Sequence, residues 1–162
     1  MRRGAISLRC RRDPPLHLLR FTIDETHYAV AIDRVIEVAS RVVVTVLPGA
    51  QDFVEGLFSY RGKVCVAVSL RRRLDHPPKA PSLSDHIIVV KGRQRLLGFA
   101  VDRVHDDVVV ASGDIATPTE GSRHINGVVP LQDGLLLIQD VDAMLTDDEE
   151  RDLDEQIQGE RA

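Results

Sequence analysis

Histidine, aspartate and cysteine are the residue types that most often do chemistry, and their spacing in this chain argues against a catalytic or metal site. The six histidines are never three or four residues apart, so none of them forms the helical pair that is typical of zinc sites. The run His105-Asp106-Asp107 could orient a base or hold a cation, but consecutive side chains on a strand point to opposite faces. The two cysteines, Cys10 and Cys65, make neither a disulfide framework nor a metal set. We therefore expect no metal and no cofactor.

The basic residues in the middle of the chain do not follow the pattern of a nucleotide or nucleic-acid site. Arg61, Lys63 and the run Arg71-Arg72-Arg73 could meet phosphate, but no aromatic residue lies between them to stack on bases. The chain has no glycine-rich phosphate loop and no nucleophile elbow around a serine. A net charge of -4 also argues against nucleic acid as the main partner. We expect a protein that is not an enzyme, with a solvated or protein-facing basic cluster.

Charge is distributed unevenly along the 162 residues. Residues 1–12 contain five arginines and no acid, whereas residues 147–162 contain eight acids and two arginines. The longest uncharged apolar stretch, near Val42 to Leu47, is too short to cross a bilayer. The basic N-terminus also lacks the apolar centre of a signal peptide. These features predict a cytoplasmic protein with a disordered basic arm over residues 1–13.

Alternating apolar residues predict short β-strands along most of the chain. Aromatic residues make up only 4% of the sequence, so Val, Ile and Leu must form the core, and valine-rich runs favour strands. Helical turns are predicted over Asp52–Gly56 and Arg71–Leu74, and a capping box at Thr146–Glu149 predicts a short C-terminal helix with a frayed end. The predicted strands are Leu16–Ile23, Thr26–Ile32, Val35–Val46, Leu57–Tyr60, Val64–Leu70, Ile87–Val90, Leu96–Val101, Val108–Ala111, Gly127–Leu131 and Leu135–Val141.

One five-residue string occurs twice in the chain. Ala-Ile-Asp-Arg-Val at 31–35 returns as Ala-Val-Asp-Arg-Val at 100–104, with similar apolar flanks. This spacing suits two similar β-subdomains better than a solenoid. We predict an all-β protein whose folded domain covers residues 14–146 and is followed by an acidic helix or tail over 147–162. The first barrel is expected over about 14–74 with allowance for strand exchange, the linker over 75–86 and the second barrel over about 87–141.

Several segments, taken in order, resemble the CheW-like family of bacterial chemotaxis scaffolds. Gly56–Arg71 resembles the family signature G-x-[IL]-N-L-R-G with its following apolar strand and Leu-Arg. Ala31–Val38 resembles V-D-x-V-x-E-V, and Leu47-Pro48-Gly49-Ala50 resembles the turn L-P-G-x. Gly98–Val104 resembles G-x-x-V-D-x-V, and Asp133–Asp140 resembles the closing hairpin. The resemblance extends over most of the predicted domain.

The resemblance implies a fold and a set of partners. The fold would be two five-stranded SH3-like β-barrels packed through a shared apolar seam, with a short C-terminal helix. Family members are non-catalytic adaptors that couple methyl-accepting chemoreceptors to a CheA-type histidine kinase in a chemosensory array. The implied partners are the chemoreceptor cytoplasmic tip, the regulatory domain of the kinase and other CheW-like proteins. Nucleic acid is not among them, and the membrane would be reached only through the receptors.

The resemblance also implies a receptor-binding groove between the barrels. We expect Glu37 and Arg61 to pair there, because an arginine in a hairpin turn can reach back over the neighbouring strand, and its guanidinium fixes a carboxylate better than lysine would. The matched positions are Val35, Glu37, Gly56, Arg61, Gly62, Asp107 and Val108.

Four positions depart from the family pattern, and they keep other functions open. Ser59-Tyr60 stands where Asn-Leu is usual, Ser69 where Asp is usual, and Asp107 where an apolar residue faces the groove. One alternative is therefore a CheW-like module of a pilus, gliding or developmental pathway. A second is a fragment of a CheV- or CheA-type protein, although the initial Met and the polar tail favour a stand-alone adaptor. A remote third is a small nucleic-acid-binding barrel.

Overall fold

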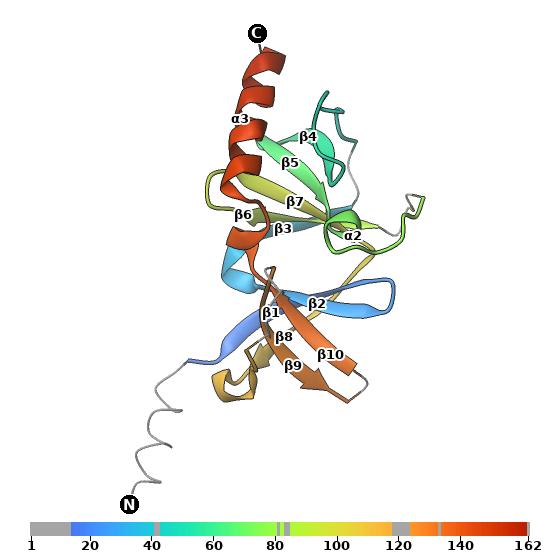
Figure 1. Ribbon diagram of the computed structural model, residues 1–162. Coiled ribbons are helices and arrows are strands. Elements are labelled where there is room, and N and C mark those ends of the chain that lie inside the picture. Colours follow the sequence, from blue (N-terminus) through green and yellow to red (C-terminus); the bar gives the residue numbers. More distant parts are fainter. Residues whose placement is uncertain are drawn as a thin grey trace, which may run out of the picture.

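The computed structural model describes residues 14–40, 43–80, 82, 85–117, 124–132 and 134–161, except the side chains of residues 159–161 (Figure 1). Within these residues, ten strands form two five-stranded sheets, which confirms the predicted all-β class. The basic arm predicted over residues 1–13 lies outside the described part of the chain. The strands are β1 (Leu16–Ile23), β2 (Thr26–Ala31), β3 (Val35–Ser40), β4 (Val54–Tyr60), β5 (Lys63–Ser69), β6 (His86–Lys91), β7 (Leu96–Val101), β8 (Arg103–Val110), β9 (Ile125–Leu131) and β10 (Gly134–Gln139).

Short helices connect the strands, and one longer helix follows them. The α-helices are α2 (Leu70–Arg73) and α3 (Asp147–Arg161), and the 3-10 turns are η1 (Ile32–Arg34), η2 (Ser112–Asp114) and η3 (Val141–Ala143). The helical turn predicted to end at Gly56 is wrong. Strand β4 already begins at Val54, and Gly56 lies inside it.

The two sheets divide the chain differently from the sequence prediction. One barrel-like sheet has the order β8-β1-β2-β10-β9, and the other has the order β3-β6-β7-β5-β4; we call them the β1 barrel and the β3 barrel (Figure 1). The predicted boundaries 14–74 and 87–141 are therefore wrong, because each barrel takes strands from both halves of the chain. The segment predicted as a linker between barrels, 75–86, instead connects strands of the same barrel. The strand exchange that the prediction allowed for is present, and it involves a whole hairpin from each repeat. The β1–β2 hairpin joins the strands of the second repeat, and the β6–β7 hairpin joins those of the first.

The internal repeat is present in the structure. Strands β1 to β5 and β6 to β10 follow the same sequence of hairpin, edge strand and second hairpin, and the isolated bridges Thr45–Leu57 and Ala116–Val128 occupy matching places. A parallel pair joins the two repeats in each barrel, β5 with β7 in one and β2 with β10 in the other. Each barrel thus consists of the first hairpin of one repeat and the last three strands of the other.

The β1–β2 hairpin is buried on both faces and forms the seam between the barrels. On one face Phe21 stacks on Tyr28 with ring centroids 5.7 Å apart, and these two rings and Val30 belong to a large core that continues into the β3 barrel. On the other face Leu18 and Ala29 pack into the smaller core of the β1 barrel. Burial on both sides explains why apolar residues occur on both faces of this hairpin.

Helix α3 belongs to the folded core. The predicted capping box is present, since Thr146 donates its backbone N–H to Glu149 Oε1 at 2.8 Å and Glu149 donates its own to Thr146 Oγ1 at 3.1 Å. Leu153 and Ile157 are buried in the large core, and Figure 1 shows the helix alongside the β3 barrel. The folded core therefore extends past residue 146, the predicted end of the domain.

Arginines of the β3 barrel bind the acidic first turns of α3. Arg73 donates to both oxygens of Glu149, at 3.0 and 2.7 Å, and its guanidinium lies 4.2 Å from the centroid of the Phe53 ring. Arg95 donates through Nε to Glu150 Oε1 at 2.8 Å. Part of the acidic charge that the sequence places in the tail thus docks the helix.

Truncating the apolar face of α3 is expected to destabilise the whole protein. Leu153→Ala should lower the free energy of unfolding by about 2 to 4 kcal/mol, because it leaves a cavity in a core that both barrels share. The exposed residue Glu155 provides the control, since Glu155→Ala on the same helix should change stability by less than about 0.5 kcal/mol. Urea unfolding measures both variants, and equal midpoints would contradict the docking of α3.

Candidate functional site

The candidate site is centred on the tip of the β4–β5 hairpin. Arg61 and Gly62 have φ angles of 50° and 80°, and two successive left-handed residues give the type I′ turn that matches the twist of antiparallel strands. Tyr60 and Lys63 pair on either side of this turn. The Arg61 side chain is 75% exposed and so is free to meet a partner.

Glu37 of β3 receives two hydrogen bonds from this hairpin. Tyr60 donates its hydroxyl to Glu37 Oε1 at 2.6 Å, and Arg61 Nη2 donates to the same oxygen at 3.2 Å. The Arg61 guanidinium also lies 5.2 Å from the centroid of the Tyr60 ring. The ion pair expected between Arg61 and Glu37 is therefore present. Because β3 and β4 are the two outer strands of their sheet, these contacts also join its edges and help to close the barrel.

Gly56 and Val35 lie in the same barrel but serve its structure. Gly56 has a φ of 151°, and a Cβ atom placed on it would be only 2.2 Å from the carbonyl oxygen of Thr45. Glycine therefore allows the chain after β3 to cross β4 and form the Thr45–Leu57 bridge. Val35, the first residue of β3, packs against the large core. Neither residue presents a polar group to a partner.

Asp107 and Val108 lie on β8 of the β1 barrel, apart from the Glu37–Arg61 pair. Asp107 pairs with the His17 side chain on the neighbouring strand β1, and hydrogen bonding from His17 lowers the pKa of the Asp107 carboxyl. Val108 packs against the small core of the β1 barrel. The acid found at an expected apolar position is thus matched by a histidine that the sequence analysis did not connect to it.

The departure at Ser69 has a local structural reason. Ser69 is the N-cap of α2, and its Oγ accepts the backbone N–H of Arg72 at 3.4 Å. Serine and aspartate are both good N-cap residues. Ser69 therefore does the capping work that an aspartate would do there.

Sequence reasoning missed a partly buried ionic network between the barrels, which is centred on Arg71. This arginine donates to Asp24 at 3.0 and 2.8 Å, to Asp102 Oδ2 at 2.6 Å and to the carbonyl of Pro77 at 2.7 Å. Asp24 lies in the turn of the β1–β2 hairpin, whereas α2 follows β5 of the other barrel. The hydrogen bonds from Arg71 hold the pKa of the Asp24 carboxyl below its ordinary value. The network therefore fastens the exchanged hairpin to the opposite barrel.

Tyr28 and His76 extend this network into the seam. The Tyr28 hydroxyl lies 2.6 Å from His76 Nε2, and His76 Nδ1 lies 3.2 Å from Asp24 Oδ2. Burial raises the pKa of Tyr28 to about 12. The network thus ties the aromatic stack of the shared core to the charged groups at its rim.

A second ion pair, between Arg34 and Asp142, also fastens the barrels. Here the repeated Asp-Arg motif contributes its arginine, whereas in the Arg71 network it contributes its aspartate. Arg34 donates to Asp142 at 3.2 and 2.5 Å and to the carbonyl of Lys91 at 2.9 and 2.7 Å. The repeated Asp-Arg pair is Asp33-Arg34 in the first copy and Asp102-Arg103 in the second. The first copy uses its arginine and the second its aspartate. The repeat motif was visible in the sequence and was the signal that could have indicated these contacts.

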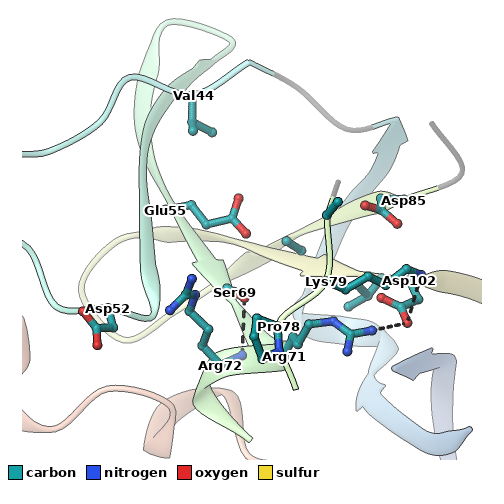
Figure 2. Close-up of a pocket in the computed structure, with 13 residues that line it drawn as sticks. Val44, Asp52, Glu55, Ser69, Arg71, Arg72, Pro78, Lys79, Asp85 and Asp102 are labelled. Carbon is teal, nitrogen blue, oxygen red and sulfur yellow. Dashed lines mark hydrogen bonds and ion pairs between the residues drawn. The ribbon is translucent and has the colours of Figure 1, made fainter. Parts of the chain in front are cut away.

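One pocket of about 460 Å³ lies beside the Arg71 network (Figure 2). Its lining includes acidic residues, among them Glu55 and Asp102, and basic residues, among them Arg72 and Lys79. No histidine or cysteine is among its lining residues in the described chain, and none of the described His, Cys, Asp or Glu side chains gather in threes to hold a metal ion. Nor is any helix in that part of the chain long and apolar enough to cross a membrane.

Acidification is expected to destabilise the protein first through His105. Burial lowers the pKa of His105, with nearby Arg20 and Arg103 adding to the effect. Because the folded pKa lies below the ordinary value of 6.5, the unfolded state binds the proton more tightly. Stability should therefore fall as the pH drops from about 6.5 through the folded pKa. Urea unfolding of wild type and His105→Gln measures this loss, which the variant should lack.

A second loss of stability is expected at lower pH from paired carboxylates. Arg71 lowers the pKa of Asp24, and Arg34 lowers that of Asp142. Burial would raise the pKa of Glu149, but hydrogen bonds from Arg73 and Thr146 outweigh it and leave the pKa lowered. The stabilisation is present above the ordinary values of 3.8 and 4.5 and is lost as the pH falls through the folded values. A stability that rises on acidification through this range would contradict the assigned pairs.

Comparisons with known proteins find one family and a similar fold. The family described as CheW-like domain matches residues 17–149. The chain is 26% identical over 133 residues to the chemotaxis protein CheW of Bacillus subtilis, covering 79% of this chain and 85% of that protein. It is 27% identical over 137 residues to the chemotaxis protein CheW of Rhizobium meliloti, covering 82% and 88%. The crystal structure of the scaffolding protein TtCheW from Thermoanaerobacter tengcongensis superposes with a TM-score of 0.78 at 24% identity, covering 83% of this chain and 95% of that one.

Proposed function

The chain belongs to the CheW-like domain family, and from this we propose that it is a non-catalytic adaptor that couples chemoreceptors to a CheA-type histidine kinase in a bacterial chemosensory array. The observation that carries the proposal is the family match over residues 17–149, which runs through both barrels. The relatives named as chemotaxis proteins are matched over most of their own length. The proposed setting is the cytoplasm, with recruitment to membrane receptors through binding alone.

An adaptor acts by binding, so it needs surfaces held in a fixed relative orientation. The exchanged hairpins give the two barrels one shared core. Ion pairs then hold the edge of that core at the two places where the chain passes from the strands of one barrel to those of the other. Arg34 lies in the connection between β2 and β3, and Asp102, which pairs with Arg71, lies between β7 and β8. A partner bound to one barrel would therefore meet the other at a set distance and angle, as a scaffold requires.

We place the receptor contact at the Glu37–Arg61 pair. Both side chains are partly or largely exposed, at 41% and 75%, while Val35, Gly56 and Gly62 hold the backbone that presents them. Asp107 and Val108 belong to the other barrel, so a receptor helix that uses them as well must lie between the barrels. The regulatory domain of the kinase would occupy a different surface.

The pair should matter more for binding than for stability. In the free protein an exposed ion pair stabilises by at most about 1 kcal/mol. Once a receptor helix covers it, a Glu37 carboxylate without its counter-charge is desolvated, at a cost of roughly 1 to 3 kcal/mol, or about 5- to 150-fold in affinity. Arg61→Ala should therefore weaken receptor binding while leaving the unfolding midpoint almost unchanged.

A double-mutant cycle tests the placement. The probe is a soluble cytoplasmic-tip fragment of a chemoreceptor from the same genome, titrated calorimetrically against wild type, Arg61→Ala, Glu37→Ala and the double variant. Glu37→Ala should be milder than Arg61→Ala, because the flexible arginine can turn toward water, and the double variant should resemble Arg61→Ala. Strictly additive losses would refute the pairing. Unchanged binding in Arg61→Ala would mean that the departures at Ser59, Tyr60 and Asp107 have moved the interface.

Partner capture tests the wider function. Tagged protein expressed in its own host should retain both a chemoreceptor and a CheA-type kinase from solubilised membranes. Recovery of a kinase and receptor from a pilus, gliding or developmental pathway would keep the adaptor function and change the pathway. Recovery of neither, with the protein folded, would refute the proposal.

A further inference from the structure

Tyr60 makes the shorter of the two hydrogen bonds to Glu37 at the proposed receptor site. Its hydroxyl donates to Glu37 Oε1 at 2.6 Å, compared with 3.2 Å for Arg61 Nη2 to the same oxygen. Among the described residues no group donates to Glu37 Oε2. The carboxylate is thus anchored through one oxygen, and the other is left for a partner.

We infer that Tyr60 is a positioning residue for receptor binding, which fixes the Glu37 carboxylate so that its second oxygen can accept a hydrogen bond from the receptor helix. The inference rests on the proposed function and deepens it. Arg61 already supplies the positive charge next to Glu37, so the receptor group best suited to Oε2 is a neutral donor such as an amide or hydroxyl.

The physical reason lies in the stiffness of the two donors. Arg61 is 75% exposed and has a long flexible stem, so its hold on Glu37 is easily lost to water. Tyr60 has only two side-chain torsions, and its backbone is fixed by pairing with Lys63. A hydrogen bond to a charged acceptor is also stronger than one between neutral groups. Tyr60 therefore sets the geometry, and Arg61 supplies the charge.

Arg61 also depends on Tyr60, because its guanidinium lies 5.2 Å from the tyrosine ring centroid. Tyr60→Phe keeps this ring and removes only the hydroxyl, so it isolates the bond to Glu37. Hydrogen bonding to Glu37 raises the pKa of Tyr60, which gives the bond a spectroscopic signature that does not depend on any partner.

The experiment measures binding of the same receptor-tip fragment in two backgrounds. In wild type, Tyr60→Phe should weaken binding by about 3- to 10-fold, the worth of one hydrogen bond. In the Glu37→Ala background the same substitution should change binding by less than about 2-fold, because its acceptor is gone. Binding of the kinase regulatory domain should stay at the wild-type value in both cases.

A titration of tyrosine ionisation supplies the independent readout. The chain has two tyrosines, and burial holds the pKa of Tyr28 at about 12. Glu37→Ala should therefore lower the pKa of Tyr60 and leave the Tyr28 step in place. An unchanged Tyr60 step would mean that the bond is absent and would overturn the inference.

The outcomes separate the inference from the proposed function. Weakened binding in Glu37→Ala with unchanged binding in Tyr60→Phe would overturn the positioning role alone. An equal loss on Tyr60→Phe in both backgrounds would mean that Tyr60 contacts the receptor itself, and would also overturn it. Unchanged binding in both Glu37→Ala and Arg61→Ala would overturn the location of the receptor site and the inference with it.

Discussion

Replacing Arg71 with methionine is expected to lower the free energy of unfolding by about 3 to 5 kcal/mol, the usual cost of removing one partner from a buried ion pair. The Arg71 side chain is 11% exposed and the Asp102 side chain 16%, so water cannot readily replace the lost bond to Asp102. Methionine keeps much of the volume, which separates the loss of charge from the loss of packing. Asp102 would be left as a buried charge with Lys79 3.9 Å away as its remaining cation.

The neighbouring residue provides a matched control. Arg72 is on the same short helix but is exposed, and its bond to the Ser69 cap is made by its backbone N–H and not by its side chain. Arg72→Met should therefore change stability by less than about 0.5 kcal/mol. Urea unfolding followed by circular dichroism measures both variants. Equal midpoints would show that the Arg71 network does not fasten the barrels.

Gly56→Ala is the second large effect, and it should lower the free energy of unfolding by about 2 to 6 kcal/mol. A residue with a side chain at φ 151° is strained by about 1 to 3 kcal/mol. The added Cβ also meets the backbone of Thr45, at 2.2 Å from its oxygen and 2.8 Å from its carbon, and overpacking of this kind adds about 1 to 3 kcal/mol. The contact is with backbone atoms, so no side-chain rotation can relieve it.

Gly113→Ala is the control for Gly56→Ala. No described atom lies within 4 Å of a Cβ at Gly113, and the change should be within about 0.5 kcal/mol.

Receptor binding by the Gly56→Ala variant shows whether Gly56 has a structural role or contacts the receptor. Receptor binding by Gly56→Ala should fall in proportion to the fraction unfolded, so a stable variant that fails to bind would mean that Gly56 contacts the receptor directly.

Local patterns in the sequence predicted most of the elements. Alternating apolar residues located most of the strands, but β3 ends at Ser40 and not at Val46, and β8 begins at Arg103 and not at Val108. The pair Arg61-Gly62 indicated the hairpin turn, and the spacing of Thr146 and Glu149 indicated the start of α3. These signals are readable because turns and caps depend on residues only a few positions apart. The Glu37–Arg61 pair was expected from the resemblance to the CheW-like family, which places both residues in one binding region.

The partners of the buried charges were not predictable in the same way. Arg71 meets Asp24, 47 residues away, and Asp102, 31 residues away. Asp107 meets His17, 90 residues away. In the sequence, each of these residues is a polar residue in a segment that is expected to be exposed to solvent. Only the packing of the β1–β2 turn against α2 takes Arg71 out of water and makes its pairs necessary.

The sequence by itself determined that the chain is a repeated β-structure, whereas the tertiary structure decided which repeat supplies each hairpin. The strings at 31–35 and 100–104 are nearly identical, and backbone hydrogen bonds between strands do not depend on side-chain identity. Pairing β5 with β7, rather than with an equivalent strand of its own repeat, is therefore invisible to local patterns. The exchange is favoured by burial, because it places Phe21, Tyr28 and Val30 against the core of the opposite barrel. Apolar area removed from water on both faces of a hairpin is a property of the whole fold and not of any short segment.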